Sequence, residues 1–348
     1  MKKILRKNFQ FIISVLKKYF AEFADSYFEK FYLDLIIGFF ENIQQTSLRN
    51  REFRHFEIRG EIPNISFLIG TSKQGLLLYH NGKITQLLQH KGFYGITKNK
   101  NNNWFAFHKT GLRGKIVSFK IVNNQIEEVY TYLWGLNRGI HQIDFIKKNK
   151  LAVINTYKNS ILIYNTFSDH RNRFWRYPLM SVYPNGKLKR GRKSTNYNHF
   201  NSIFKYKDRF ILLAHNETYK TKRKSELFIT DLSFKDKKIL KIKGSNCHNY
   251  YRNKNNEILC ASLEKAIQIN GENVLFLNGF TRGLSVADDF YIFGSSEIQY
   301  DKTLRDTTDG WIYIYDLDLN KVSSILIKRT QINEIRRIDK TELSMISY

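Results

Sequence analysis

The sequence that decides the fold is His141-Gln-Ile-Asp-Phe, which is followed ten residues after its start by Leu151-Ala-Val-Ile. A short strand-forming run led by a polar or aromatic residue is thus followed by a second apolar run. The same phrase returns five more times, with Tyr94, His199, His248, Arg282 and Glu334 as leading residues. Runs of this length, broken by Asn, Gly, Asp and Lys, predict pairs of antiparallel strands.

Two further strands follow most of these pairs, as in Lys115–Phe119 and Glu128–Tyr132. Four short strands per repeat are typical of β-propeller blades, and such blades must stack because none buries both of its faces alone. The last phrase, 333–348, is half a blade, and the first strands, at 67–88, lack a leading strand. If these halves complete each other, the chain is an all-β, six-bladed propeller. Seven blades are an alternative, and a two-sheet sandwich fits the regular phrase less well.

The N-terminal residues have a different pattern. Between Phe9 and Leu35 the apolar side chains recur mostly every three or four residues, which predicts an amphipathic helix. We therefore expect a basic helical segment at 1–60 and the propeller at 61–348. The first eighteen residues contain six basic residues and no acidic one. Such a helix suits peripheral contact with an anionic membrane, and packing against the propeller or a second copy is the alternative.

The overall charge is +26, which favours anionic partners, although compositional drift also explains it. The two cysteines, Cys247 and Cys260, form no CxxC motif and indicate a reducing compartment. No apolar run reaches the roughly 20 residues of a membrane span. We expect a cytoplasmic protein, at most peripheral to a membrane.

Polar residues are predicted to collect at one mouth of the propeller. In a meander the innermost strand starts at the end where the second strand finishes, so both sets of residues meet there. His141, His199 and His248 are candidate ligands for a divalent metal, with Glu264, Glu297 or Glu334 as a further ligand or proton carrier. Alternatively, the histidines cap strands around a hydrated channel or bind a ligand directly. The predicted ligand-binding residues at this mouth are Tyr94, Asn155, Asn201, His215, Asn216, Asn249 and Arg282. For the asparagines, capping of local backbone is the alternative.

The insertion at 169–198 is rich in basic residues with aromatic residues between them. Arg173, Trp175 and Arg176 are its candidate ligand-binding residues. Basic and aromatic side chains together suit an acidic glycan or single-stranded nucleic acid, here at 170–193. No RNA- or DNA-binding signature accompanies them, and a solvated loop is the alternative.

Several phrases resemble those of uncharacterised bacterial six-bladed propellers, themselves similar to the NHL, SMP-30 and strictosidine-synthase-like group. They are His141-Gln-Ile-Asp, Asn198-His199-Phe-Asn-Ser-Ile, Cys247-His248-Asn and Gly279-Phe-Thr-Arg-Gly283-Leu. The resemblance covers about 65–348 and implies a propeller fold. The group includes lactonases, lyases and binding scaffolds. SMP-30-like lactonases hold a metal with acidic and amide side chains, where this chain has histidines.

Two functions follow. The first is a binding module whose axial face and basic rim hold a polar or anionic small molecule, a glycan, a peptide or a protein partner. The second is a metal-dependent hydrolase or lyase with a three-histidine site.

Overall fold

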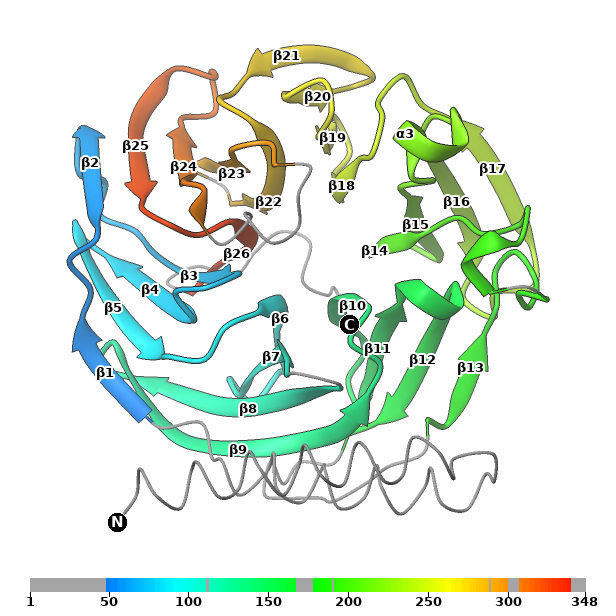
Figure 1. Cartoon of the computed structure of the whole chain (residues 1–348), viewed down its shortest axis with the longest axis horizontal. Helices are drawn as coiled ribbons and strands as arrows, with labels where there is room; N and C mark the ends of the chain where they lie inside the picture. The colour runs from blue at the N-terminus through cyan, green and yellow to red at the C-terminus, as the bar shows by residue number, and fades with distance from the viewer. Residues whose placement is uncertain are drawn as a thin grey trace. The chain divides into compact units, whose positions relative to one another are not determined.

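The chain forms a six-bladed β-propeller, as predicted from the repeated phrase (Figure 1). The structure is a computed structural model and describes residues 48–110, 113–166, 178–189, 191–287, 289–299 and 307–338. Six antiparallel sheets surround a central axis, which settles the alternative of seven blades. The helix predicted from the N-terminal pattern lies outside the described residues.

The blades follow one another in chain order. Blade 1 contains β3 (Ser66–Thr71), β4 (Leu76–His80) and β5 (Lys83–Leu88). Blade 2 contains β6 (Phe93–Lys98), β7 (Trp104–Lys109), β8 (Gly114–Val122) and β9 (Gln125–Leu136). Blade 3 contains β10 (Ile140–Lys147), β11 (Lys150–Asn155), β12 (Ser160–Asn165) and β13 (Met180–Val182), with the 3-10 turn η1 (Thr156–Lys158) after β11.

Blade 4 contains β14 (Phe200–Tyr206), β15 (Arg209–Ala214), β16 (Glu226–Asp231) and β17 (Lys237–Lys241), with η2 (Gly191–Lys193) before it and α3 (Thr218–Thr221) after β15. Blade 5 contains β18 (His248–Arg252), β19 (Glu257–Ala261), β20 (Ala266–Ile269) and β21 (Glu272–Phe276). Blade 6 contains β22 (Phe280–Val286), β23 (Tyr291–Ser296), β24 (Gly310–Tyr315) and β25 (Lys321–Ile327).

The ring is closed at both its inner and its outer edge. The C-terminal strand β26 (Ile332–Arg337) is the innermost strand of blade 1 and pairs with β3, as expected from the two half-blades. In addition, β1 (Leu48–Glu52) pairs with β5 of blade 1, and β2 (Phe56–Gly60) pairs with β25 of blade 6. These pairings cover two outer edges that would otherwise expose unpaired backbone groups.

The propeller unit begins at Leu48, so β1 and β2 lie within the segment 1–60 that was predicted to be helical. The sequences of β1 and β2, LRNRE and FEIRG, are short and rich in charge. β1 lacks the apolar alternation that marks a half-buried strand, whereas in β2 Phe56 and Ile58 alternate with charged residues over too short a run to predict a strand.

The core fills the spaces between neighbouring blades. At the closure, Ile69 of blade 1, Ile292 and Ile312 of blade 6, and Ile335 of β26 belong to one buried apolar cluster. The second strand of each blade is almost wholly apolar because both of its faces are covered by adjacent blades. Burial of these side chains holds consecutive sheets together.

Every inner strand has a register shift close to its start. In blades 1 to 6, in that order, the shift lies between the following residue pairs: Ile332/Glu334, Tyr94/Ile96, Ile140/Ile143, Phe200/Ser202, His248/Tyr250 and Thr281/Leu284. Such β-bulges turn side chains away from the regular alternation. Six equivalent bulges thus face one another around the axis.

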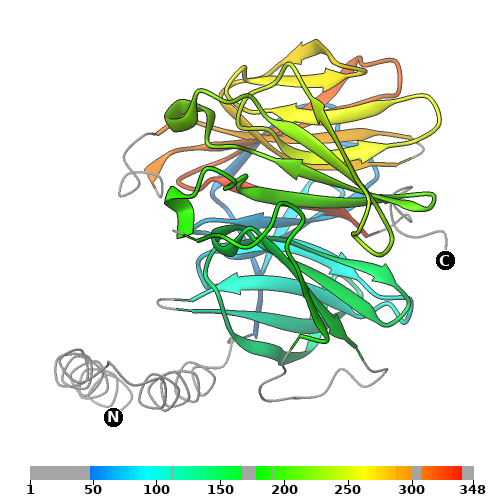
Figure 2. The same ribbon diagram turned by 90° about the vertical axis from the view of Figure 1, so that its right-hand side faces the viewer.

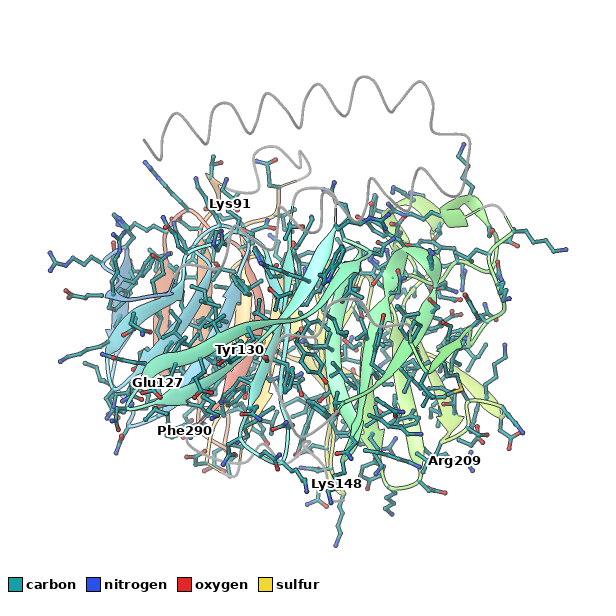
Figure 3. All side chains as sticks on the ribbon, turned by 90° about the horizontal axis from the view of Figure 1, so that it is seen from below. Lys91, Glu127, Tyr130, Lys148, Arg209 and Phe290 are labelled. Carbon is teal, nitrogen blue, oxygen red and sulfur yellow. The ribbon has the colours of Figure 1, made fainter. Side chains whose placement is uncertain are left out.

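All inner strands start at the same end of the propeller. Figure 3 shows Lys91, on the loop leading into β6, at one end, and Lys148, Arg209 and Phe290 at the other. The last three residues lie at or beside the turns that join first and second strands. The strands run between these two ends in the side view (Figure 2). We call the end at which the inner strands start the axial mouth.

Candidate functional site

A cavity of about 370 Å³ opens at the axial mouth. Its lining comes from all six blades, because residues of β26 complete it on the side of blade 1. The volume lies within the range of sites that hold small molecules. The polar and charged residues that line it include Tyr94, Lys109, Arg138, His141, Arg192, His199, His215, Glu217, His248, Arg282 and Glu297.

Four histidines from three consecutive blades form a closed ring of aromatic contacts, which we call the histidine ring. The ring centroids of His141 and His199 are 5.2 Å apart, and those of His199 and His215 are 4.5 Å apart. The centroids of His215 and His248 are 5.0 Å apart, and those of His248 and His141 are 6.2 Å apart. The bulges at the starts of β10 and β18 help to bring these side chains together.

Burial keeps the histidine ring neutral. It lowers the pKa of His141, His215 and His248 well below 6.5, and the positive charge of Arg282 lowers each further. Burial also lowers the pKa of His199, and Arg192 acts in the same direction. Glu217 opposes this shift at His199 through a hydrogen bond and its charge, and at His215 through its charge. Near neutral pH the ring therefore presents uncharged imidazoles to the cavity.

The partners of the Nδ1 atoms assign the tautomers. His248 Nδ1 donates to the carbonyl oxygen of Asn246 at 2.9 Å, so it carries the proton. His215 Nδ1 accepts the backbone N–H of Glu217 at 3.0 Å, so its proton is on Nε2. His141 Nδ1 lies 3.4 Å from an Arg282 guanidinium nitrogen, which can only donate, and its proton is also on Nε2.

His199 completes an alternating pattern. Its Nδ1 is 3.1 Å from Glu217 Oε1 and 3.0 Å from the hydroxyl of Tyr197. The Glu217 carboxylate is ionised and only accepts, so the proton is on Nδ1. Around the ring, Nε2 is therefore an N–H donor at His141 and His215 and a lone-pair acceptor at His199 and His248.

Glu217 is the anchored acid of the site. It is buried and accepts hydrogen bonds from Arg192 and from Lys220, whose Nζ is 3.0 Å from Oε2. Although burial acts in the opposite direction, hydrogen bonds from His199 and Lys220 hold the pKa of Glu217 far below 4.5. The residue has a φ of 46°, in the left-handed region, and His199 has a φ of 54°. Such backbone conformations are costly for residues other than glycine and are concentrated at functional sites.

Arg282 brings a positive charge into the cavity from the bulge of β22. Its guanidinium group lies 5.1 Å from the centre of the Tyr94 ring, and the ammonium group of Lys109 lies 5.9 Å from the same ring. Stacking on an aromatic face fixes the orientation of a cation. Two of the cations that line the cavity thus lie against one tyrosine, beside the neutral histidine ring.

The structure brings seven of the predicted site residues into this cavity. They are Tyr94, His141, His199, His215, His248, Arg282 and Glu297. Glu297 is exposed and accepts the backbone N–H of Asp309 at 3.2 Å. Sequence reasoning missed Glu217, although it follows directly after His215 and Asn216, which were predicted to lie at the mouth.

The predicted asparagines do not line the cavity, because their amides tie the backbone together. Asn201 donates to the carbonyl oxygen of Cys247 in the next blade at 2.7 Å, and Asn249 accepts the N–H of Gly283 in the next blade at 2.8 Å. Asn155 caps η1, and Asn216 donates to the carbonyl oxygen of Lys224. Capping of backbone, the alternative for these residues, is what the structure shows.

Two of the predicted proton carriers are also placed elsewhere. Glu264 accepts the backbone N–H of Ser245 at 2.9 Å in blade 5. Glu334 is buried deeper along the axis, where it accepts from Asn249 at 3.3 Å and lies 3.7 Å from Arg336. Both carboxylates serve the framework rather than the cavity.

The predicted metal site and the predicted basic insertion both stay predictions. Among the described residues, no group of three or more His, Cys, Asp or Glu side chains is arranged to hold a metal ion. The metal site predicted from His141, His199 and His248 stays a prediction. Arg173, Trp175 and Arg176 lie outside the described residues, as do 170–177 and 190 of the segment 170–193, and the nucleic-acid contacts suggested for it stay a prediction.

Comparison with known proteins gives the fold. No family model and no curated protein sequence matches the chain. A protein from Lactobacillus plantarum has a similar structure, with a TM-score of 0.52, 10% identity and coverage of 79% of this chain and 99% of that one. A protein of unknown function from Bacteroides caccae has a TM-score of 0.51 and 10% identity over 80% and 100% of the two chains.

A periplasmic gluconolactonase from Pseudomonas aeruginosa is similar as well, with a TM-score of 0.51 and 9% identity over 79% of this chain and 99% of that one. At these identities the likeness extends to the architecture alone. In the described part of the chain, no helix has the length and apolar character needed to cross a membrane.

Proposed function

We propose that the axial cavity binds a small hydroxylated anion of the sugar-acid type, either free or at the end of an acidic glycan. The observation that carries this proposal is Arg282, which stands in the cavity beside a neutral histidine ring. A carboxylate on a guanidinium group forms a charge-assisted hydrogen bond, the stronger class of such bonds. The rest of the lining suits the remainder of such a ligand.

The charge balance of the lining supports an anion. Four cationic side chains face two carboxylates, and the histidines add no charge. Glu217 is already paired with Arg192 and Lys220, so its negative charge is largely compensated. An anion entering the cavity therefore meets a net positive field from Lys109, Arg138 and Arg282.

The alternation of tautomers supports a polyhydroxy ligand. A sugar hydroxyl both donates and accepts, and the histidine ring offers two N–H donors and two lone pairs at neighbouring positions. Tyr94 supplies an aromatic face beside them. We include in the proposal a relationship to the NHL, SMP-30 and strictosidine-synthase-like group. Within it, this chain would bind its ligand at histidines, in the region where SMP-30-like lactonases hold a metal with acidic and amide side chains.

Isothermal titration tests the proposal with D-glucuronate and with its neutral counterpart D-glucose. D-glucuronate should bind the purified chain, and D-glucose should bind at least 10-fold more weakly. Arg282→Gln should weaken glucuronate binding by about 10- to 100-fold, the worth of a hydrogen bond to a charged group. Arg209→Gln, which changes an exposed arginine at the other end of the propeller, is the matched control and should bind normally.

Equal affinity for glucose and glucuronate, or unchanged binding in Arg282→Gln, would contradict the proposal. Elemental analysis of the same preparation tests the predicted metal. A stoichiometric metal that is lost in His248→Ala would favour the metal-dependent enzyme instead.

A further inference from the structure

We propose that this cavity hydrolyses carboxylic esters whose acyl part carries a second, anionic group, with His199 as the general base and Glu217 as its positioning residue. The inference rests on the anion binding proposed above and adds a reaction to it. It follows from the arrangement of the His199 Nε2 lone pair, which is backed by Glu217, with two N–H donors and one guanidinium group around a single cavity.

His199 has the orientation of a general base. Its Nδ1–H is held by Glu217, so the basic lone pair on Nε2 is on the opposite edge of the imidazole. Glu217 is itself fixed by Arg192 and Lys220, which leaves the pair little freedom to rotate. A carboxylate that orients a histidine in this way also stabilises the imidazolium formed when the base accepts a proton.

The left-handed backbone at His199 and Glu217 supports this assignment. Neither residue is glycine, and each has a positive φ that costs about 1–3 kcal/mol. The two strained positions are in direct contact through their side chains. Both partners of this hydrogen bond are thus held in left-handed backbone conformations, which fix their mutual geometry.

The donors needed for a developing negative charge lie on either side of the base. His141 and His215 are both in ring contact with His199, and both carry their proton on Nε2. Neutral N–H groups held in place before reaction stabilise an oxyanion because they do not have to reorient. An ester carbonyl between His199 and these donors can thus be attacked by water that His199 deprotonates, while the N–H groups stabilise the negative charge on its oxygen.

The step is an ordinary hydrolysis. His199 Nε2 removes a proton from water, the water oxygen bonds to the carbonyl carbon, and the C=O electron pair moves onto oxygen beside the Nε2–H groups of His141 and His215. The C=O bond then re-forms, the bond to the alkoxy oxygen breaks, and the leaving oxygen takes the proton from the His199 imidazolium. Arg282 holds the distal carboxylate of the substrate, which selects acidic esters.

The probe is mono-4-nitrophenyl glutarate, an acidic ester, compared with neutral 4-nitrophenyl acetate. The full chain should hydrolyse the glutarate ester with saturation, and D-glucuronate should inhibit competitively. His199→Asn should lower kcat by at least 100-fold, the range of general base catalysis. The asparagine amide can replace Nδ1–H toward Glu217 but has no equivalent of Nε2. His55→Asn, at an exposed histidine, is the control and should keep full activity.

Glu217→Gln tests whether Glu217 positions His199 for catalysis or only stabilises the fold. The Glu217 charge raises the pKa of His199, so its removal should move the acid limb of the pH–rate profile to lower pH while kcat falls. Other charged and titratable groups facing His199 are Arg192, Arg282, Tyr197, His141 and His215.

The proposed reaction would be overturned if the wild-type chain cleaved the glutarate ester no faster than buffer does. It would also be overturned if His199→Asn kept the wild-type kcat. If glucuronate still binds the same preparation, only this inference fails. If binding is absent too, the proposed function fails with it.

Discussion

Lowering the pH should destabilise the propeller through its histidine ring. Each of the four imidazoles is neutral in the folded state because its pKa is lowered, whereas in the unfolded chain it titrates near 6.5. The stability that depends on them is complete above pH 6.5. It is lost as the pH falls from 6.5 toward the folded pKa values, because the unfolded state then binds more protons.

The expected loss is large. Each neutral imidazole contributes up to about 1.4 kcal/mol per pH unit, and about 1 kcal/mol over the first unit below 6.5, where the unfolded imidazole is only partly protonated. His141, His215 and His248, whose pKa values are well below 6.5, therefore remove about 3 kcal/mol between pH 6.5 and pH 5.5, set against a usual total of about 5–15 kcal/mol. Buried His108, whose pKa is also well below 6.5, adds to the loss. The stability that depends on ionised Glu217 is complete above its unfolded pKa of 4.5, so this residue adds to the loss only below pH 4.5.

Urea unfolding followed by tryptophan fluorescence, at pH values between 5 and 8, measures this slope. His248→Asn replaces Nδ1–H with an amide donor toward the Asn246 carbonyl oxygen and removes one titrating group. The slope of unfolding free energy against pH should decrease by up to about 1.4 kcal/mol per unit. His55→Asn should leave it unchanged. A wild-type stability that is constant from pH 7.5 to 5.5, or an unaltered slope in His248→Asn, would refute the reasoning.

Three further changes test the framework by urea unfolding. Gly95→Ala places a methyl group 2.6 Å from a backbone nitrogen of β10 and should cost about 1–3 kcal/mol more than Gly271→Ala, where the added carbon meets nothing within 4 Å. Ile335→Ala, in the closing strand, should cost about 2–5 kcal/mol, whereas exposed Ile62→Ala should cost little. Thr156→Val removes a 2.6 Å hydrogen bond to a carbonyl oxygen of β14 and should cost about 1–3 kcal/mol. Equal losses within either pair, or no loss in Thr156→Val, would contradict the packing described.

Much of the fold could be predicted because each repeat of the sequence phrase corresponds to the paired first and second strands of one blade. The leading residues Tyr94, His141 and His248 lie within two residues of the starts of β6, β10 and β18. The closing strand β26 was predicted from an unpaired half-blade. In contrast, β1 and β2 were missed because an outer edge strand needs only one covered side and therefore tolerates a charged sequence.

The site could be predicted only in part, because register alone does not give side-chain partners. His141, His199 and His248 meet as expected, since equivalent positions of neighbouring blades face one axis. The bulges that turn Asn201 and Asn249 toward the next blade leave no mark in hydrophobic periodicity. Glu217 lies beyond the end of β15, where the left-handed backbone redirects its side chain toward His199.

Nitrogen-15 NMR of the histidine side chains, in protein labelled only at histidine, tests the assembled site most directly. At pH 7 the resonances of His141, His199, His215 and His248 should all be those of neutral imidazoles. Two of them, His199 and His248, should carry the proton on Nδ1, and the other two on Nε2. Imidazolium signals from these residues, or one tautomer shared by all four, would contradict the account.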